Sequence, residues 1–207
     1  NLQVISSLLS LEAERLTDTK TLEAFRESQN RVTSMALIHE ELYKGTGTDN
    51  LDFAAYLRKL TEDLFRSYKL GNKDISLKLD LEQVYLGMDT AIPLGIIVNE
   101  LVSNSLKHAF SAVRRGEIRI NLSKCEISTS IDNISDPDGD CPDRDDFHYI
   151  LTVADNGNGI PEEIDFQNAD SLGLQLVNIL VDQIDGSIEL NRDKGAKFVI
   201  SFSDIEE

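Results

Sequence analysis

The 207-residue sequence is poor in tryptophan, proline and positively charged residues. It contains no tryptophan, four prolines, and only 20 lysines and arginines against 37 aspartates and glutamates. The resulting charge of −17 disfavours binding to nucleic acid or to an anionic membrane, because both are polyanions. No apolar run approaches the roughly 18 residues of a membrane span, and the start does not resemble a secretory signal. We expect a cytoplasmic chain; membrane attachment of its parent protein stays open.

The two cysteines, Cys125 and Cys141, are too few for a disulfide framework and fit a reducing compartment. We therefore expect free thiols. Hydrophobic residues make up 41% of the chain and charged residues 28%, which is typical of a globular protein with a real core. The chain begins with Asn rather than Met, which indicates a piece of a longer protein.

The first 49 residues read as two amphipathic helices, over 1–16 and 19–43, joined by a short turn. A hairpin of this kind cannot bury both of its apolar seams alone. We expect it to pair with a second copy into a four-helix bundle, the alternative being packing on its own domain.

The remainder, 50–207, mixes helical and strand patterns. Helices are predicted over 51–69, 91–109 and 173–184, and strands over 75–81, 85–89, 117–123 and 148–154, with a closing hairpin of SIELN and KFVISF. The predicted fold class is α+β: a two-layer sandwich of one mixed sheet with helices on one face, preceded by the helical hairpin.

The segment IVNELVSNSLKHAF (97–110) has one apolar helical face and one unusual polar face. The polar face carries Glu100, Asn104 and Lys107, with His108 at its seam. Amides mixed with single charges are not the repeated Glu/Lys pattern of an ordinary solvated surface.

A second informative segment is VADNGNGIP (153–161), where an apolar strand runs into Asp155 and a loop with Gly157 and Gly159, closed by Ile160. Glycines allow positive φ and let backbone N–H groups approach a ligand. A partly buried Asp at such a strand end would accept from a donor such as an exocyclic amine. A plain turn is the alternative, and a calcium loop fits poorly.

A third segment, SLGLQLV (171–177), begins an apolar helix with Gly173 and Leu174. Free N–H groups at a helix N-terminus suit phosphate, although the same pattern also fits an ordinary helix start.

Taken in order, these three segments resemble the ATP-binding fold shared by histidine kinases, DNA gyrase, Hsp90-type chaperones and MutL-type repair proteins. The resemblance implies ATP and Mg²⁺ as ligands, with Mg²⁺ on Asn104 and Glu100 as a base or orienting group. It also places Lys107 and His108 near the phosphates and Asp155 on the adenine amino group. Residues Gly157, Gly159 and Ile160 would shape the pocket, and Gly173 and Leu174 would close the lid.

The segments NLQVISSLLSLEAERL, ESQNRVTSMALIHEELY and AIPLGIIVNELVSNSLKHAF closely resemble a subfamily of sensor histidine kinases of two-component systems. This implies a dimerisation and phosphoacceptor hairpin over 1–49 and an ATP-binding catalytic domain over 50–207. The implied partners are a second copy of the chain, an upstream sensor domain and a response regulator receiver domain. The rivals are an ATPase that switches conformation without phosphorelay, and a degenerate dimerisation module.

The sequence departs from the subfamily in three places. The phosphoaccepting histidine of the subfamily lies just before the Asn-Leu-Gln with which this chain begins, so we expect it to be missing here. His39 is interpreted as structural and His148 as a surface residue. The acidic stretch 124–146 is longer than a strand connection needs; a solvated loop is favoured over a Ca²⁺ site. Ala196 stands where the family usually has a hydroxyl residue.

Overall fold

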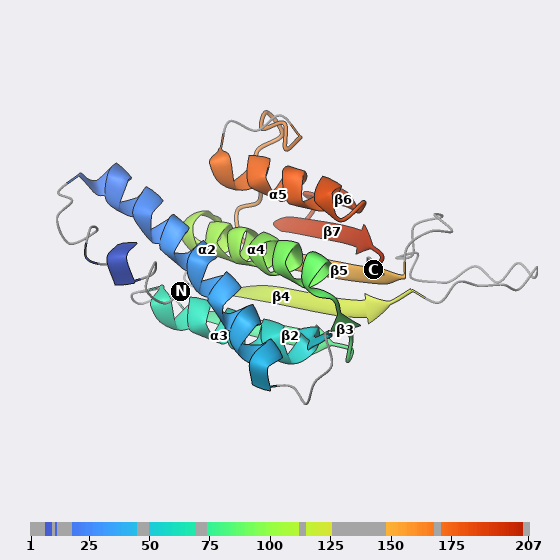
Figure 1. Ribbon diagram of the computed structural model, residues 1–207. Helices are drawn as coiled ribbons and strands as arrows, with labels where there is room; N and C mark the ends of the chain where they lie inside the picture. The colour runs from blue at the N-terminus through green and yellow to red at the C-terminus, as the bar shows by residue number, and fades with distance from the viewer. Residues whose placement is uncertain are drawn as a thin grey trace, which may run out of the picture.

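The chain folds around one mixed five-stranded sheet with helices on one face, as Figure 1 shows, which confirms the predicted α+β class. This computed structural model describes residues 7–9, 11, 18–44, 50–68, 74–111, 115–125, 148–167 and 171–204. Most of the helix predicted over 1–16 lies outside these residues, as does the acidic stretch beyond Cys125.

The strands of the sheet follow the order β2-β4-β5-β7-β6. Their bounds are β2 Asp74–Leu81, β4 Arg115–Lys124, β5 Tyr149–Asp155, β7 Ala196–Phe202 and β6 Ser187–Asn191. Only β2 and β4 run parallel among these neighbours; the other pairs are antiparallel. Alternating side chains along each strand divide between the helical layer and the open face, which is why the strands were recognisable by their period of two.

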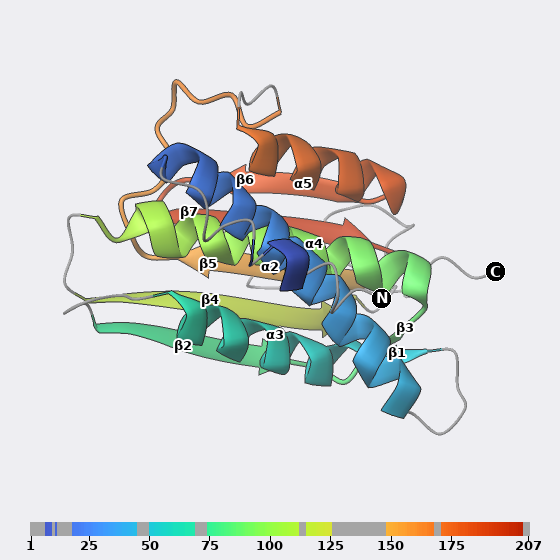
Figure 2. The ribbon, with the colours of Figure 1, turned by 60° about the vertical axis from the view of Figure 1, so that its left-hand side comes forward.

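Three helices cover the inner face of the sheet, with α4 in the middle (Figure 2). They are α3 Phe53–Ser67, α4 Met88–Asn104 and α5 Leu172–Gln183. Asp52 begins α3 by accepting from the backbone N–H of Ala55 at 3.0 Å. The strand predicted over 85–89 is shorter, β3 Tyr85–Leu86, and pairs with β1 Leu51–Asp52 outside the main sheet.

A fourth helix, α2 Thr19–Lys44, lies across α4 and α3 on the side away from the sheet (Figure 2). Leu37 and Ile38 are buried in the same core as α4, so α2 packs on its own chain. The Tyr56 hydroxyl of α3 donates to the backbone oxygen of Ser34 at 3.4 Å, and burial raises the pKa of this phenol. Pairing of the hairpin with a second copy stays a prediction.

The segment that follows α4 is a π-helix, η1 Ser105–Ala109, rather than the last turn of the predicted α-helix. The apolar positions expected on the inner face, including Ile97, Leu101 and Leu106, are all buried. Five residues are too few to show a helical period, so the sequence pattern did not separate a π-helix from an α-helix. A π turn inside a helix frequently marks a functional site.

Cys125 is disulfide-bonded, which corrects the expectation of free thiols. The number of cysteines in a sequence does not say whether two of them come within bonding distance, and that distance decides pairing. Within the described ranges, no helix is long and apolar enough to cross a membrane.

Candidate functional site

The polar face of α4 is buried instead of forming an open pocket wall, which differs from the expectation. Asn99, Glu100 and Ser103 are almost inaccessible to solvent, and Asn104 is half-buried. The Asn99 side-chain oxygen and the Ser103 hydroxyl have no hydrogen-bond partner within the structure described. Buried polar atoms without partners are costly, so these two atoms are candidates for contact with water or a ligand.

Glu100 is paired with a residue that sequence analysis missed, Arg31 of α2. Nε of Arg31 donates to Oε1 of Glu100 at 2.7 Å, and Nη2 donates to Oε2 at 3.0 Å. The two side chains are 14% and 5% exposed. A fork-to-fork pair of this kind is among the stronger ion pairs in proteins, because two charge-assisted bonds act together. No local pattern could have found it, since the partners are 69 residues apart.

Gly173 at the start of α5 lies against the same carboxylate. A Cβ at Gly173 would stand 2.7 Å from Oε2 of Glu100 and 3.9 Å from Nδ2 of Asn104. The structure therefore brings together three predicted site residues, and the absence of a side chain at Gly173 allows this close approach. The side chain of Leu174 is buried in the core, so only its backbone could reach a ligand.

Asp155 lies at the end of β5 and is 8% exposed. Oδ2 accepts from the Ser105 hydroxyl at 2.8 Å, while Oδ1 accepts from the backbone N–H groups of Gly157 at 3.0 Å and Ala196 at 3.4 Å. Ser105 begins the π-helix directly after Asn104, so η1 links the Asp155 cluster to the polar face of α4. Sequence analysis missed Ser105, although a hydroxyl among apolar helix positions was a signal.

Two positions beside Asp155 are glycine for different physical reasons. A Cβ at Gly157 would collide with the backbone oxygen of Ala109, so the turn needs glycine for close approach to η1. Gly159 has φ +72°, a conformation that side-chain-bearing residues rarely adopt. The turn therefore packs directly against the end of η1, and Asn158 N donates to the Ala109 oxygen at 2.8 Å.

The remaining predicted residues differ in how far they are buried. Ile160 is half-buried and packs against the core, Lys107 is half-buried, and His108 is exposed. His148 is exposed, as predicted, and its Nδ1 lies 3.1 Å from the Ser203 hydroxyl. The side chain of His39 lies outside the described part of the chain.

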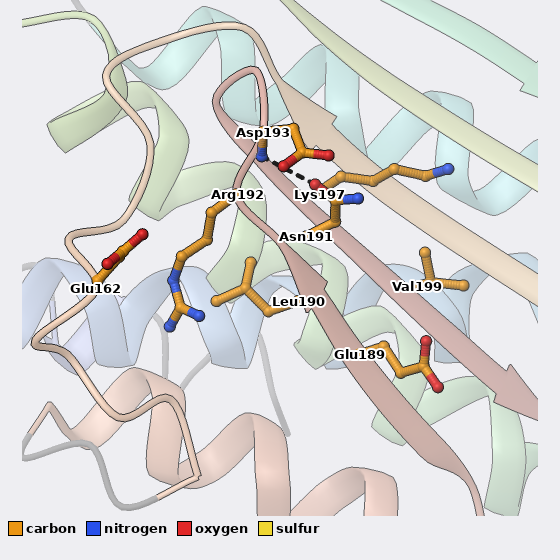
Figure 3. Close-up of a pocket in the computed structure, with 8 residues that line it drawn as sticks. All are labelled: Glu162, Glu189, Leu190, Asn191, Arg192, Asp193, Lys197 and Val199. Carbon is orange, nitrogen blue, oxygen red and sulfur yellow. Dashed lines mark hydrogen bonds between the residues drawn. The ribbon is translucent and has the colours of Figure 1, made fainter.

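Two hollows on the described surface bear on the position of the site. One of about 370 Å³ borders Asp155 and Gly195, together with Arg119, Lys194 and Lys197. The other, of about 670 Å³, lies beside edge strand β6 and contains none of the predicted site residues (Figure 3). Arg192 beside it donates to the Ile164 oxygen at 2.9 Å and ties the 161–167 segment to β6.

Neither hollow reaches Glu100 or Asn104. We place the candidate site at the carboxylates, where donors and glycines converge.

Comparison with known families identifies the family of the chain. Residues 89–205 match the model of histidine kinase-, DNA gyrase B- and HSP90-like ATPases, and residues 1–68 match a histidine kinase model. The chain belongs to the sensor histidine kinases of this ATPase family.

Individual relatives are also histidine kinases. The chain is 29% identical to sensor histidine kinase PdtaS of Mycobacterium tuberculosis, over 97% of this chain and 36% of that one. It is 26% identical to blue-light-activated histidine kinase 2 of Erythrobacter litoralis, over 87% of this chain and 47% of that protein. The chain thus spans about a third to a half of these relatives.

Solved structures share the fold. The histidine kinase domain of E. litoralis EL346 superposes with a TM-score of 0.70 at 20% identity, covering 97% of this chain and 93% of that domain. The Acinetobacter baumannii histidine kinase AdeS gives a TM-score of 0.57 at 17% identity, over 100% of this chain and 96% of that one.

Proposed function

We propose that this chain binds Mg-ATP between α4, the Asp155 turn and the start of α5. The observation that carries the proposal is the Asp155 carboxylate, buried and fixed by one hydroxyl and two backbone donors beside close-packed glycine turns. A fixed anionic acceptor at such a turn suits the exocyclic amino group of adenine. Backbone approach without side chains in the way suits the flat base.

Mg²⁺ would be held by the side-chain oxygen of Asn104 together with the phosphates. An amide oxygen fits a hard cation that keeps several of its waters. Among the residues described, no group of three or more His, Cys, Asp or Glu could hold a metal by itself. We infer that Mg²⁺ enters with the nucleotide, where it would neutralise charge on the transferring phosphoryl group.

In the intact protein, Glu100 would orient or deprotonate the acceptor imidazole, and Lys107 would face the phosphates. The segment between Pro161 and Gly173 would order over bound nucleotide and exclude water. The γ-phosphoryl group would pass to a histidine that the resemblance places just upstream of Asn1, and then to an aspartate of a response regulator receiver domain. The helical hairpin would supply the dimer contact and the docking surface.

Incubation with γ-labelled ATP tests this assignment. The 207-residue chain should release phosphate slowly and carry no stable label, whereas a version extended upstream should be labelled on a histidine. Stable label on the 207-residue chain would show that the acceptor is misplaced. Nucleotide turnover without label on the extended chain would favour an ATPase that works without phosphorelay.

A further inference from the structure

The carboxylate of Glu100 is closed off on two sides. Arg31 of α2 occupies both oxygens through the bonds described above, and the Asn99 amide also donates to Oε1 at 3.3 Å. Gly173 of α5 lies directly against Oε2. In this arrangement Glu100 is only 4% exposed, and both of its oxygens already accept hydrogen bonds from Arg31.

Two of the contacts that the structure describes between α2 and the rest of the chain matter here. One is apolar: Leu37 and Ile38 are buried in the core, and the Ser34 oxygen accepts from Tyr56. The other is the ion pair one turn earlier, at Arg31. Described side chains of α2 before Arg31, such as Leu22 and Phe25, are only half-buried. A tilt of this first part of α2 would therefore break the ion pair while the apolar attachment persists.

We propose that Arg31 is a positioning residue that holds Glu100 in a closed, resting arrangement, and that phosphoryl transfer requires Arg31 to withdraw. This inference rests on the proposed function and adds its regulation. With Arg31 withdrawn, Glu100 accepts the proton of the attacking water or imidazole as its oxygen or nitrogen bonds to the γ-phosphorus. The bond from that phosphorus to the bridging oxygen breaks, its electron pair leaves with ADP, and the proton stays on Glu100.

The unpartnered polar atoms nearby agree with a second arrangement. The Ser103 hydroxyl lies one turn from Asn99 on the same face of α4, and Asn99 Oδ1 is also buried without a partner in the part of the chain described. A different position of α2, or bound nucleotide and its water, would satisfy these atoms. The resting arrangement thus leaves two buried polar groups without hydrogen bonds, and a second arrangement can supply those bonds.

The first experiment compares Arg31→Met with a matched control, Lys59→Met. Lys59 of α3 makes a second charged contact with α2, to Glu40 at 3.6 Å on the exposed surface. Binding of a fluorescent ATP analogue with Mg²⁺ and steady-state phosphate release are measured for each chain. Arg31→Met should raise kcat about fivefold or more, because a freed base acts directly on the attacking group. The nucleotide Kd should stay within about twofold, and Lys59→Met should change neither.

An unchanged or lower kcat in Arg31→Met, at unchanged nucleotide affinity, would overturn the proposal. If none of the chains binds Mg-nucleotide, the proposed function fails, and Arg31 is judged by a measurement that needs no activity. Carbodiimide-catalysed amidation of Glu100, followed by mass spectrometry without nucleotide, should be several-fold faster in Arg31→Met than in the parent and in Lys59→Met.

Equal amidation rates in folded parent and variant would contradict the closed arrangement itself. Circular dichroism checks that each chain is folded. Arg31→Lys serves as the second variant should Arg31→Met unfold. It keeps the charge but not the two-bond fork, so its amidation rate and kcat should lie between those of the parent and Arg31→Met.

Discussion

The two buried carboxylates of the site, Glu100 and Asp155, are held in different ways. The donors to Asp155 are a hydroxyl and two backbone amides from η1, the adjoining turn and β7. The strongest donor to Glu100 is a guanidinium on α2, a helix outside the sandwich. Asp155 is therefore fixed by the same geometry that makes the sheet, whereas Glu100 depends on where α2 lies. We therefore expect recognition of the adenine base by Asp155 to be constant. Phosphoryl transfer, which needs Glu100, should be open to regulation.

The largest effect on activity is expected at Glu100, the carboxylate whose position depends on α2. Glu100→Gln removes the proposed base while keeping its size, so phosphate release from Mg-ATP should fall by about a hundredfold or more, with nucleotide affinity nearly unchanged. Phosphate release and analogue binding measured on the same preparation separate the two quantities. An equal loss of phosphate release and of nucleotide affinity would mean that Glu100 binds nucleotide as Asp155 does. It would contradict the difference in role between the two carboxylates.

A second change tests the packing of α3 against α4, which also positions the Tyr56 hydroxyl that donates to α2. Gly95 of α4 lies against the Tyr56 ring, and a Cβ there would collide with the phenolic oxygen. Gly95→Ala should lower the free energy of unfolding by about 1–3 kcal/mol, because the buried ring must move. Urea unfolding followed by circular dichroism measures this. The affinity for the ATP analogue in native buffer should remain close to that of the parent, since the Asp155 cluster does not contact Tyr56. A large loss of affinity would mean that Asp155 also depends on the packing around Tyr56.

A smaller effect is expected for the hydroxyl that holds the fixed carboxylate. Ser105→Ala removes the 2.8 Å bond to Asp155 and should weaken nucleotide affinity by about two- to tenfold, the equivalent of one hydrogen bond of roughly 0.5–1.5 kcal/mol. A titration with the fluorescent analogue detects a change of this size. Ser67→Ala, which removes a hydroxyl bond of the same length to the Leu64 oxygen at the end of α3, is the matched control. If Ser105→Ala binds as tightly as the parent, Asp155 needs only its backbone donors.

Sequence patterns predicted most of the fold because burial follows periodicity. The alternation in β2 and β4 and the apolar stripe of α4 each reflect one face meeting the core, and the bounds agree within a few residues. The glycine turn after Asp155 was recognisable for the same kind of reason, since close backbone approach and positive φ demand glycine.

The contacts that complete the site were not predictable in this way. The Arg31–Glu100 pair depends on how α2 lies across α4, and no spacing in the chain records that position. Ser105 faces Asp155 in a π turn, while a regular α-helix was expected there. Leu174 was assigned to the lid from its place beside Gly173, but its side chain fills the core. Each of these depends on three-dimensional packing between distant segments.

The most direct test of the nucleotide site is calorimetry with Mg²⁺ and a non-hydrolysable ATP analogue, comparing the parent chain with Asp155→Asn. The parent should bind with measurable heat. The variant, which loses the anionic acceptor, should bind at least about tenfold more weakly, as expected for a hydrogen bond to a charged group. No heat with the folded parent, or equal affinity in the two chains, would contradict the account.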